Sequence, residues 1–356
     1  MVNMNKTIPV REGEDLDPDL IDPVMKSHIE GLTGEPEVRQ FASGHSNLTY
    51  SLVYGDRRFV LRRPPFGTKP KSGHSMIREY RVMKALKPVF NAVPTCYFHI
   101  DEDHSPLGAE FYVMDQVLGR KLEKNIPSDW GFGAEEGNRL CHAFFDKLID
   151  LHQVDYQAIG LGDFGKAEGY VKRQITGWNR RFERAHTEDV ETFQDVRDWL
   201  VAVMPETEAG HAICHGDYRL DNVILNGDNP FQIDAILDWE ISAIGDPLMD
   251  LGNTLAYWIE PTDPEMLRAT AMQPSMADGM LTRAEICEKY ALATGYDLSK
   301  FAFYHVYGVF RLAVIIQQIY YRYYHGQTQN KAFAGFGQMV GVLGNYARTL
   351  IEQSKL

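Results

Sequence analysis

Apolar residues near the start of the chain fall into short runs separated by turn-forming residues. Two runs rich in Val, Tyr, Phe and Leu lie between Val38 and Arg63, and Gly55 with Asp56 separates them. Strand-like runs joined in this way are typical of a β-hairpin, and Pro64 marks its end. Similar patterns predict helices over 23–32 and 75–86 and strands over 95–100 and 110–116.

Beyond Gly119 the spacing of apolar residues becomes helical. The helices expected from it cover 137–152, 169–185 and 190–204, and most of the chain after residue 248. Two short strands, 222–225 and 232–237, flank a turn at 227–230. The second part of the chain is therefore helical, with one strand pair inserted.

This order of elements predicts an α+β fold with two lobes, a β-rich N-terminal lobe and a mostly helical C-terminal lobe. Residues 1–22 are polar and acidic, so we expect a loosely held N-terminal arm there. The N-terminal lobe is expected over 23–117 and the C-terminal lobe over 118–356.

Composition and charge are those of a soluble globular enzyme. The 356 residues are 44% hydrophobic and 24% charged, and the chain is long enough for a sizeable core. The formal net charge of −13 argues against nucleic acid as the main partner, because phosphate backbones need clustered Lys and Arg.

Cysteine usage and hydropathy predict a cytoplasmic location without membrane contact. The four cysteines are widely spaced, at Cys96, Cys141, Cys214 and Cys287. They include no Cys-x-x-Cys pair, which fits reduced thiols better than disulfides or a zinc site. The charged start of the chain is unlike a secretory signal. Arg311 and Arg322 interrupt the aromatic stretch 303–324, which predicts a buried helix rather than a membrane span.

Asp217, Asn222 and Asp238 form the candidate chemical centre. They stand in the segments HGDYRLDN (215–222) and ILDWE (236–240). Asp217 can accept or orient the proton of an acceptor hydroxyl, while Asn222 and Asp238 can hold magnesium against nucleotide phosphates. Oxygen ligands without a Cys or His cluster favour magnesium over zinc. The set indicates phosphoryl transfer.

Neighbouring residues extend this centre and leave alternatives open. Arg219 can neutralise charge on the transferring phosphoryl group, and His215 can brace the loop. The alternative is that Asp217 and Asp221 are turn residues and that Asp238 caps a following helix. A metal-dependent hydrolase built on His215 and Asp217 would need further ligands, for which His211 is the nearby candidate.

The segments HGD (215–217) with Asn222, DWE (238–240), GDP (245–247) and DLG (250–252) resemble the aminoglycoside phosphotransferase and choline kinase superfamily, which has a protein-kinase-like fold. In particular, the chain is similar to kinase-like domains related to those fused to some acyl-CoA dehydrogenases. The resemblance runs from about Val38 to the C-terminal helices. It implies an ATP- or GTP-dependent, magnesium-requiring O-phosphotransferase acting on a hydroxylated small molecule.

The resemblance also assigns a nucleotide site to the N-terminal lobe. Its phosphate-covering loop corresponds to Ser43, Gly44, His45, Ser46 and Asn47. Arg62 matches the strand position where many relatives carry an ATP-contacting Lys, although the adjacent Arg63 is one residue away. Glu79 is the candidate partner of Arg62, and the backbone near Gln116 and Val117 is expected to bind adenine.

Three further residues that match the family are expected to be structural. His152 is expected to be a hydrogen-bonded histidine at a helix end, Asp246 to cap a helix, and Asp250 to brace the catalytic loop.

The helical lobe is expected to bind the acceptor. A polycationic aminoglycoside needs a cleft lined with carboxylates, and the sequence does not place a group of carboxylates around Asp217. A less charged, acyl-type hydroxylated metabolite is therefore favoured, and the rival is a nucleotide-binding module without catalysis.

Overall fold

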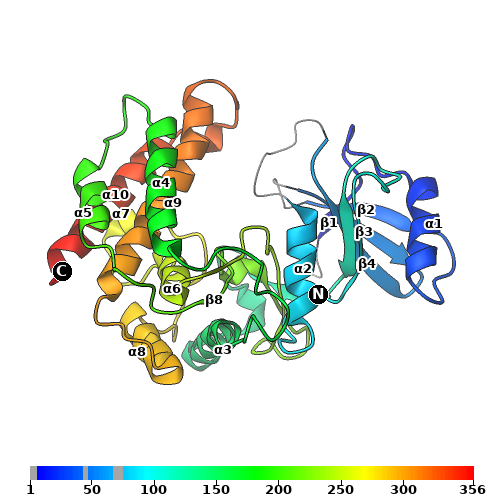
Figure 1. The fold of residues 1–356 in the computed structure, drawn as a ribbon, viewed down its shortest axis with the longest axis horizontal. Helices are drawn as coiled ribbons and strands as arrows, with labels where there is room; N and C mark the ends of the chain where they lie inside the picture. Colours follow the sequence, from blue (N-terminus) through cyan, green and yellow to red (C-terminus); the bar gives the residue numbers. More distant parts are fainter. Residues whose placement is uncertain (1–5, 43–46, 67–74) are drawn as a thin grey trace. The chain divides into compact units, whose positions relative to one another are not determined.

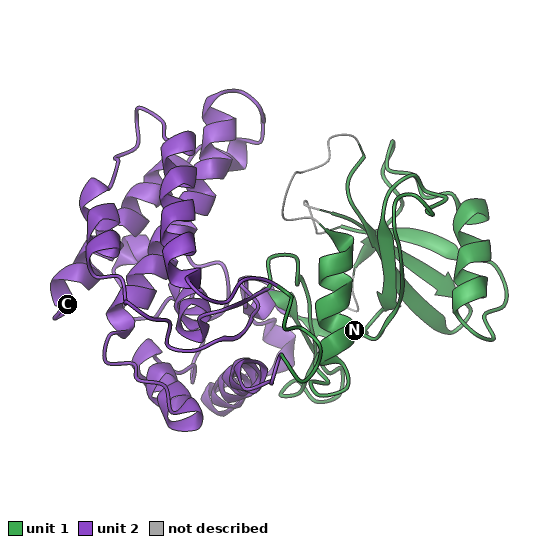
Figure 2. Ribbon diagram, viewed as in Figure 1, with its two compact units in different colours: residues 1–121, 157–164, 222–242 green, residues 122–156, 165–221, 243–356 purple. Residues whose placement is uncertain are grey.

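The computed structural model describes residues 6–42, 47–66 and 75–356. They form two compact units, and each is discontinuous in sequence (Figure 2). Unit 1 comprises residues 1–121, 157–164 and 222–242, and unit 2 comprises residues 122–156, 165–221 and 243–356. The expected division was contiguous, so the structure differs from it in giving 157–164 and 222–242 to the strand-rich unit. The fold is α+β, as predicted.

Unit 1 is built around an antiparallel sheet of six strands in the order β1-β2-β3-β4-β6-β5 (Figure 1). The strands are β1 (Thr7–Ile8), β2 (Glu37–Phe41), β3 (Leu48–Tyr54), β4 (Arg57–Arg63), β5 (Cys96–Ile100) and β6 (Phe111–Asp115). The predicted hairpin joins β3 to β4 through Gly55, whose positive φ of 61° suits glycine. Residues 7–8, expected in a loose arm, instead pair with β2.

Two helices cover opposite faces of this sheet, α1 (Pro18–His28) and α2 (Met76–Leu86) (Figure 1). Helix α1 begins earlier than expected, because Asp17 accepts a hydrogen bond from the Asp19 N–H and Pro18 suits the first turn. Ile21 and Met25 of α1 pack with the sheet residues of one apolar core. The other face packs against α2.

A second sheet of unit 1 joins segments far apart in sequence. Its strands are β7 (Arg120–Lys121), β9 (Val223–Leu225) and β10 (Ile233–Ile236). A Cβ at Gly119 would lie 2.2 Å from the Leu225 carbonyl oxygen, so this approach requires glycine. The Ile236 N–H also donates to the Ala92 carbonyl at 2.8 Å. These contacts explain why 222–242 belongs to unit 1.

Unit 2 is mainly helical (Figure 1). Its helices are α3 (Ala134–His152), α4 (Tyr170–Ala185), α5 (Gln194–Ala202), α6 (Pro247–Ala256), α7 (Glu265–Arg268), α8 (Arg283–Thr294), α9 (Phe301–Tyr324) and α10 (Phe336–Gln353). Two short strands, β8 (Ala212–Cys214) and β11 (Ala243–Gly245), pair antiparallel. Short 3₁₀ turns lie at Ser128–Trp130, Leu220–Asn222 and Lys331–Phe333.

Helix α9 is the central helix of unit 2. It packs against α4, α6 and α10, and most of its residues are buried. The prediction of a buried aromatic helix is therefore confirmed. No helix within the described residues is long and apolar enough to cross a membrane.

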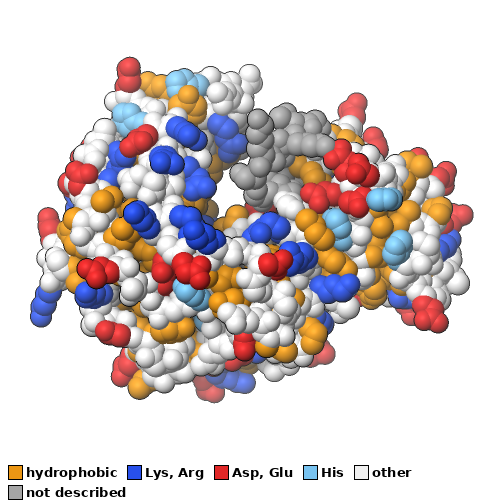
Figure 3. All heavy atoms as spheres, in the orientation of Figure 1, with side chains coloured by type: hydrophobic (Ala, Val, Ile, Leu, Met, Phe, Trp, Pro, Cys, Tyr) orange, Lys and Arg blue, Asp and Glu red, His pale blue; other side chains and the backbone are white. Residues whose placement is uncertain are grey.

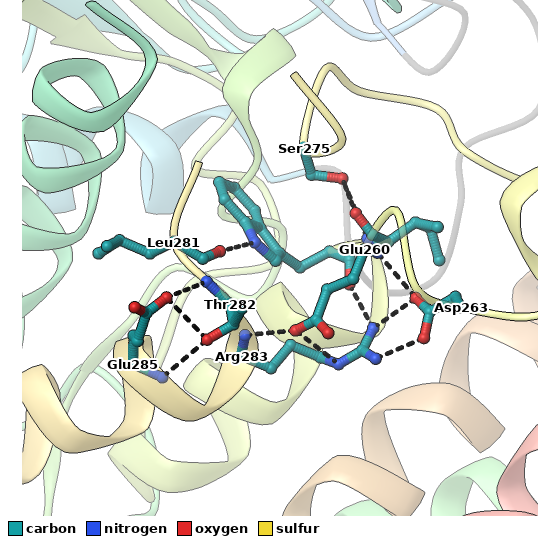
Figure 4. A network of polar contacts seen from close by, with 9 residues as sticks. Glu260, Asp263, Ser275, Leu281, Thr282, Arg283 and Glu285 are labelled. Atoms are coloured by element: carbon teal, nitrogen blue, oxygen red, sulfur yellow. Dashed lines mark hydrogen bonds and ion pairs between the residues drawn. The ribbon is translucent and has the colours of Figure 1, made fainter. Parts of the chain in front are cut away.

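An ion-paired network fixes the segment that follows α6 in unit 2 (Figure 4). Arg283 donates to both carboxylate oxygens of Asp263, at 2.8 and 2.6 Å, and lies 3.4 Å from Glu260. It also donates to the Trp258 carbonyl at 2.8 Å. The segment that begins at Tyr257 is thereby tied to the start of α8.

Candidate active site

The candidate catalytic loop of unit 2 leaves β8 at Cys214 and is braced by Asp250 of α6. The Asp250 carboxylate accepts from the His215 N–H at 2.7 Å and from the Gly216 N–H at 2.8 Å. Gly216 has a φ of 84°, a conformation that residues with a side chain rarely adopt. The loop therefore depends on one glycine and one buried carboxylate.

His152 completes this brace from the end of α3. Its Nε2 lies 3.2 Å from Asp250, and its Nδ1 lies 2.7 Å from the Tyr290 hydroxyl. Burial would raise the pKa of Asp250, but His152, His215 and the Gly216 N–H together lower it. The structural roles expected of His152 and Asp250 are confirmed, as is that of Asp246, which caps α6 by accepting from the Leu248 N–H.

Asp217 lies beside Arg219 on this loop. The two side chains approach to 3.5 Å, and Arg219 also donates to Asp221 at 2.8 Å. The Arg219 guanidinium stacks on the Tyr257 ring, 4.7 Å from its centroid. Burial and the charge of Asp217 raise the pKa of Tyr257 to about 12, so its phenol is neutral near pH 7. The sequence pattern contained no signal for Tyr257.

His215 is fully buried, and its Nδ1 accepts from the Asp217 N–H at 3.2 Å. The ring therefore acts as the expected brace of the loop. Within the described ranges, no group of three or more His, Cys, Asp or Glu residues could hold a metal ion. The further ligands that the hydrolase hypothesis needs are not found among these residues.

In unit 1, Arg62 pairs with Glu79 of α2 and lies 3.5 Å from Asp238. Burial alone would lower the pKa of Arg62, yet the Glu79 carboxylate raises it overall. Burial likewise raises the pKa of Glu79, and the guanidinium opposes that shift. Since arginine stays protonated at any ordinary pH, the Arg62 guanidinium is charged. Arg63 points to the other face of the sheet, near Tyr50 and stacked on Phe66.

Asn222 and Asp238 lie at the same end of the β9–β10 pair. The Leu237 N–H donates to the Asn222 carbonyl at 2.8 Å, which continues the ladder by one step. Asp238 has a φ of 68°, and its side chain is 38% exposed. It does not cap a helix, because β11 follows it and Asp246 caps α6. Asp238 thus holds a backbone conformation that is costly for a residue with a side chain.

The remaining predicted nucleotide-binding residues are only partly described. Ser43, Gly44, His45 and Ser46 lie outside the described residues. Asn47 donates to Glu240 at 3.0 Å, a partner that the sequence did not indicate. The Gln116 N–H donates to the Arg58 carbonyl at 3.2 Å, and its side chain accepts from Ser51. The Gln116 N–H is therefore already engaged by the neighbouring strand.

Comparison with known proteins identifies the family. The sequence profile of the "Phosphotransferase enzyme family" matches residues 37–286. Mouse acyl-CoA dehydrogenase family member 10 is 32% identical over 344 residues, covering 96% of this chain and 32% of that protein. Human acyl-CoA dehydrogenase family member 11 is 30% identical over 338 residues, covering 93% of this chain and 42% of that protein. The chain thus spans less than half of these relatives.

Solved structures share the fold. A protein from Ralstonia eutropha, provisionally described as an aminoglycoside phosphotransferase, has a TM-score of 0.81 at 32% identity, covering 96% of this chain and 99% of that one. Choline kinase from Cryptosporidium parvum has a TM-score of 0.64 at 14% identity, covering 95% and 97%. The chain therefore belongs to the phosphotransferase enzyme family and has the kinase-like fold of the aminoglycoside phosphotransferases and choline kinases.

Proposed function

We propose that this protein transfers the γ-phosphoryl group of ATP or GTP to a hydroxyl group of a small molecule. The observation that carries the proposal is the chain of charges in unit 1. Buried Glu79 pairs with Arg62, and Arg62 approaches the more exposed Asp238 beside Asn222. A fixed cation next to two oxygen ligands suits a metal-bound polyphosphate.

The residues of both units have distinct roles in this proposal. Asp217 accepts or orients the proton of the acceptor hydroxyl, and Arg219 stabilises charge on the transferring group. Asn222 and Asp238 would hold magnesium, which neutralises phosphate charge when bound. One carboxylate and one amide oxygen fit this ion, since magnesium takes few protein ligands and completes its shell with phosphates and water. Arg62 holds the phosphates.

The charges of unit 2 bear on the acceptor. The carboxylates of Glu260 and Asp263 are engaged by Arg283, and Glu285 caps α8 with Thr282 (Figure 4). These acids are therefore bound to other groups rather than available for a polycation. The surface of α4 is instead basic (Figure 3). Its exposed charged residues are Lys172, Arg173, Arg180, Arg181, Glu183 and Arg184.

We therefore favour an uncharged or anionic hydroxylated acceptor of acyl type over an aminoglycoside. The names of the relatives, acyl-CoA dehydrogenase family members, point in the same direction. A basic helix repels polyamines and attracts carboxylates or phosphates.

The test is acceptor-dependent release of ADP or GDP in the presence of magnesium. The panel contains hydroxy acids, their acyl thioesters and aminoglycosides. We expect turnover with the first two groups and a loss of about 10²- to 10⁴-fold in Asp217→Ala. Asp228→Ala is the matched control, since Asp228 is exposed in the β9–β10 turn. Its turnover should equal that of the wild type.

Two outcomes would contradict the proposal. Wild-type turnover in Asp217→Ala would remove the catalytic assignment. Nucleotide binding without release of ADP or GDP for any acceptor would favour the non-catalytic alternative, in which Arg62 and Glu79 serve binding only.

A further inference from the structure

Arg311, in the middle of α9, contacts the same catalytic loop as Asp250. Its Nη2 donates to the Gly216 carbonyl at 2.8 Å. The N–H of the same residue donates to Asp250. Gly216 is thus held at both of its backbone polar groups, by a buried carboxylate on one and a buried guanidinium on the other.

Helices α6 and α9, which carry Asp250 and Arg311, pack with their backbones in close contact at Gly252 and Gly308. A Cβ at Gly308 of α9 would lie 2.1 Å from the Gly252 carbonyl oxygen of α6. A Cβ at Gly252 would lie 2.3 Å from the Tyr304 carbonyl oxygen. Gly252 follows Asp250 on α6, and Gly308 precedes Arg311 on α9 by one helical turn. The backbone contact of the helices therefore sets the separation of the two charges.

Arg311 is an unusual residue for a core position. Its side chain is 4% exposed, and it stacks on Trp178 with 5.2 Å between guanidinium and ring centroid. Burial would lower its pKa, but Tyr307, Tyr257 and Asp217 raise it overall. A buried cation costs several kcal/mol in desolvation unless hydrogen bonds and charges compensate. Packing alone does not explain an arginine here, because an apolar side chain would fill the space without that cost.

We propose that Arg311 is a positioning residue that, together with Asp250, fixes the Gly216 peptide and thereby the direction of the Asp217 side chain. Gly216 immediately precedes Asp217, so a rotation at residue 216 displaces the carboxylate of Asp217. A displacement of about 1 Å can lower turnover about 100-fold. The inference rests on the proposed role of Asp217, but the clamp on the loop can be measured without it.

The experiment combines hydrogen exchange of the loop with turnover. In Arg311→Met the amides of the 212–220 peptide should exchange about tenfold faster than in the wild type. Release of ADP from MgATP, with water or an acceptor from the screen, should fall about 10- to 100-fold. The KM for ATP should stay within about twofold, because the nucleotide residues lie in unit 1. Arg311→Lys should reverse part of both effects, since its ammonium group keeps the charge and can still donate a hydrogen bond.

Arg197→Met is the matched control. Arg197 is also a buried arginine of unit 2, but it bonds to Asn179, Glu183 and Gln194 rather than to the catalytic loop. This variant should leave exchange of the 212–220 peptide unchanged. If Arg311→Met does not fold, Arg311→Gln replaces it, because glutamine keeps an amide donor without the charge.

The outcomes separate this inference from the proposed function. Unchanged exchange of the 212–220 peptide in a folded Arg311 variant overturns the clamp. Faster exchange with wild-type turnover overturns the positioning role, provided that Asp217→Ala is inactive. If Asp217→Ala remains active, the catalytic role of Asp217 fails, and the positioning role of Arg311 fails with it.

Discussion

At the scale of single residues, strand geometry separates Arg62 from Arg63, which lie on opposite faces of the sheet. Side chains alternate between the faces of β4, so Phe59 and Leu61 enter the core beneath α1 while Arg62 faces α2. The sequence suggested Glu79 as the partner of Arg62, and the ion pair confirms that contact. If the assignment were shifted by one residue to Arg63, the guanidinium would lie on the face of the sheet that packs against α1.

Arg62→Met tests this assignment. We expect the KM for ATP to rise about 10- to 100-fold, because a charge-assisted contact with phosphate contributes about 1.5–3 kcal/mol. The buried Glu79 would lose its cation, so the pKa of its carboxyl group, already raised by burial, should rise further. Arg63→Met should change the KM for ATP less than twofold. Equal effects of the two substitutions would refute the assignment.

Other residue-scale features could not be predicted from the sequence. The left-handed backbone of Asp238 depends on where β10 ends. The contact of Arg219 with Tyr257 and that of Asn47 with Glu240 join residues whose proximity is set by tertiary packing. No local sequence pattern predicts such contacts. The candidate roles of Asp217, Asn222 and Asp238, by contrast, could be proposed from their residue types and spacing alone.

At the scale of elements, periodic segments were predicted well and very short ones were missed. The expected helix 75–86 is α2 (Met76–Leu86), and the expected helix 169–185 is α4 (Tyr170–Ala185). Strands β7, β8 and β11 have two or three residues each. Alternation needs about four residues to be visible, so these strands give no signal. They nevertheless frame the catalytic loop and the β9–β10 pair.

The contact between α6 and α9 yields a prediction at this scale. Gly308→Ala places a Cβ against the Gly252 carbonyl, and forcing the helices apart should lower the free energy of unfolding by about 1–3 kcal/mol. Gly341→Ala on α10 is the control. No atom lies within 4 Å of the added Cβ, so this variant should gain about 0.5–1 kcal/mol from helix propensity. Urea unfolding measures both, and a loss in Gly341→Ala equal to that in Gly308→Ala would contradict the argument.

At the scale of the whole molecule, the α+β class was predicted but the division of the chain was not. Sequence patterns are read along the chain, so they favour contiguous lobes. The contacts of Ile236 with Ala92 and of β7 with β9 join segments more than 100 residues apart, and only the folded structure reveals them.

Global stability should depend on pH through His305 of α9. Burial lowers the pKa of His305 to about 3, the nearby Arg283 adds to the shift, and Asp263 opposes it. The Tyr346 ring packs edge-on at 5.8 Å. In the unfolded chain the pKa is about 6.5. Below pH 6.5 the unfolded state therefore binds a proton that the folded state does not, and stability falls towards pH 3.

Urea unfolding at pH 7.5 and 5.5 measures this effect. His305→Gln removes the titrating group, so the wild type should lose about 1.4 kcal/mol more than the variant between these two pH values. Groups other than His305 titrate in both proteins and cancel in the comparison. An equal loss in both would show that His305 does not carry the dependence.

The discontinuous make-up of unit 1 also governs how the chain can fold as it leaves the ribosome. Residues 1–121 emerge first, but β7 must wait for β9 and the Ala92 carbonyl for Ile236. The nascent unit therefore stays incomplete until residue 242 has been synthesised, by which time much of unit 2 has also emerged. For the same reason, a fragment cut after residue 121 lacks Asn222 and Asp238, so it should not reproduce the nucleotide site that we propose for unit 1.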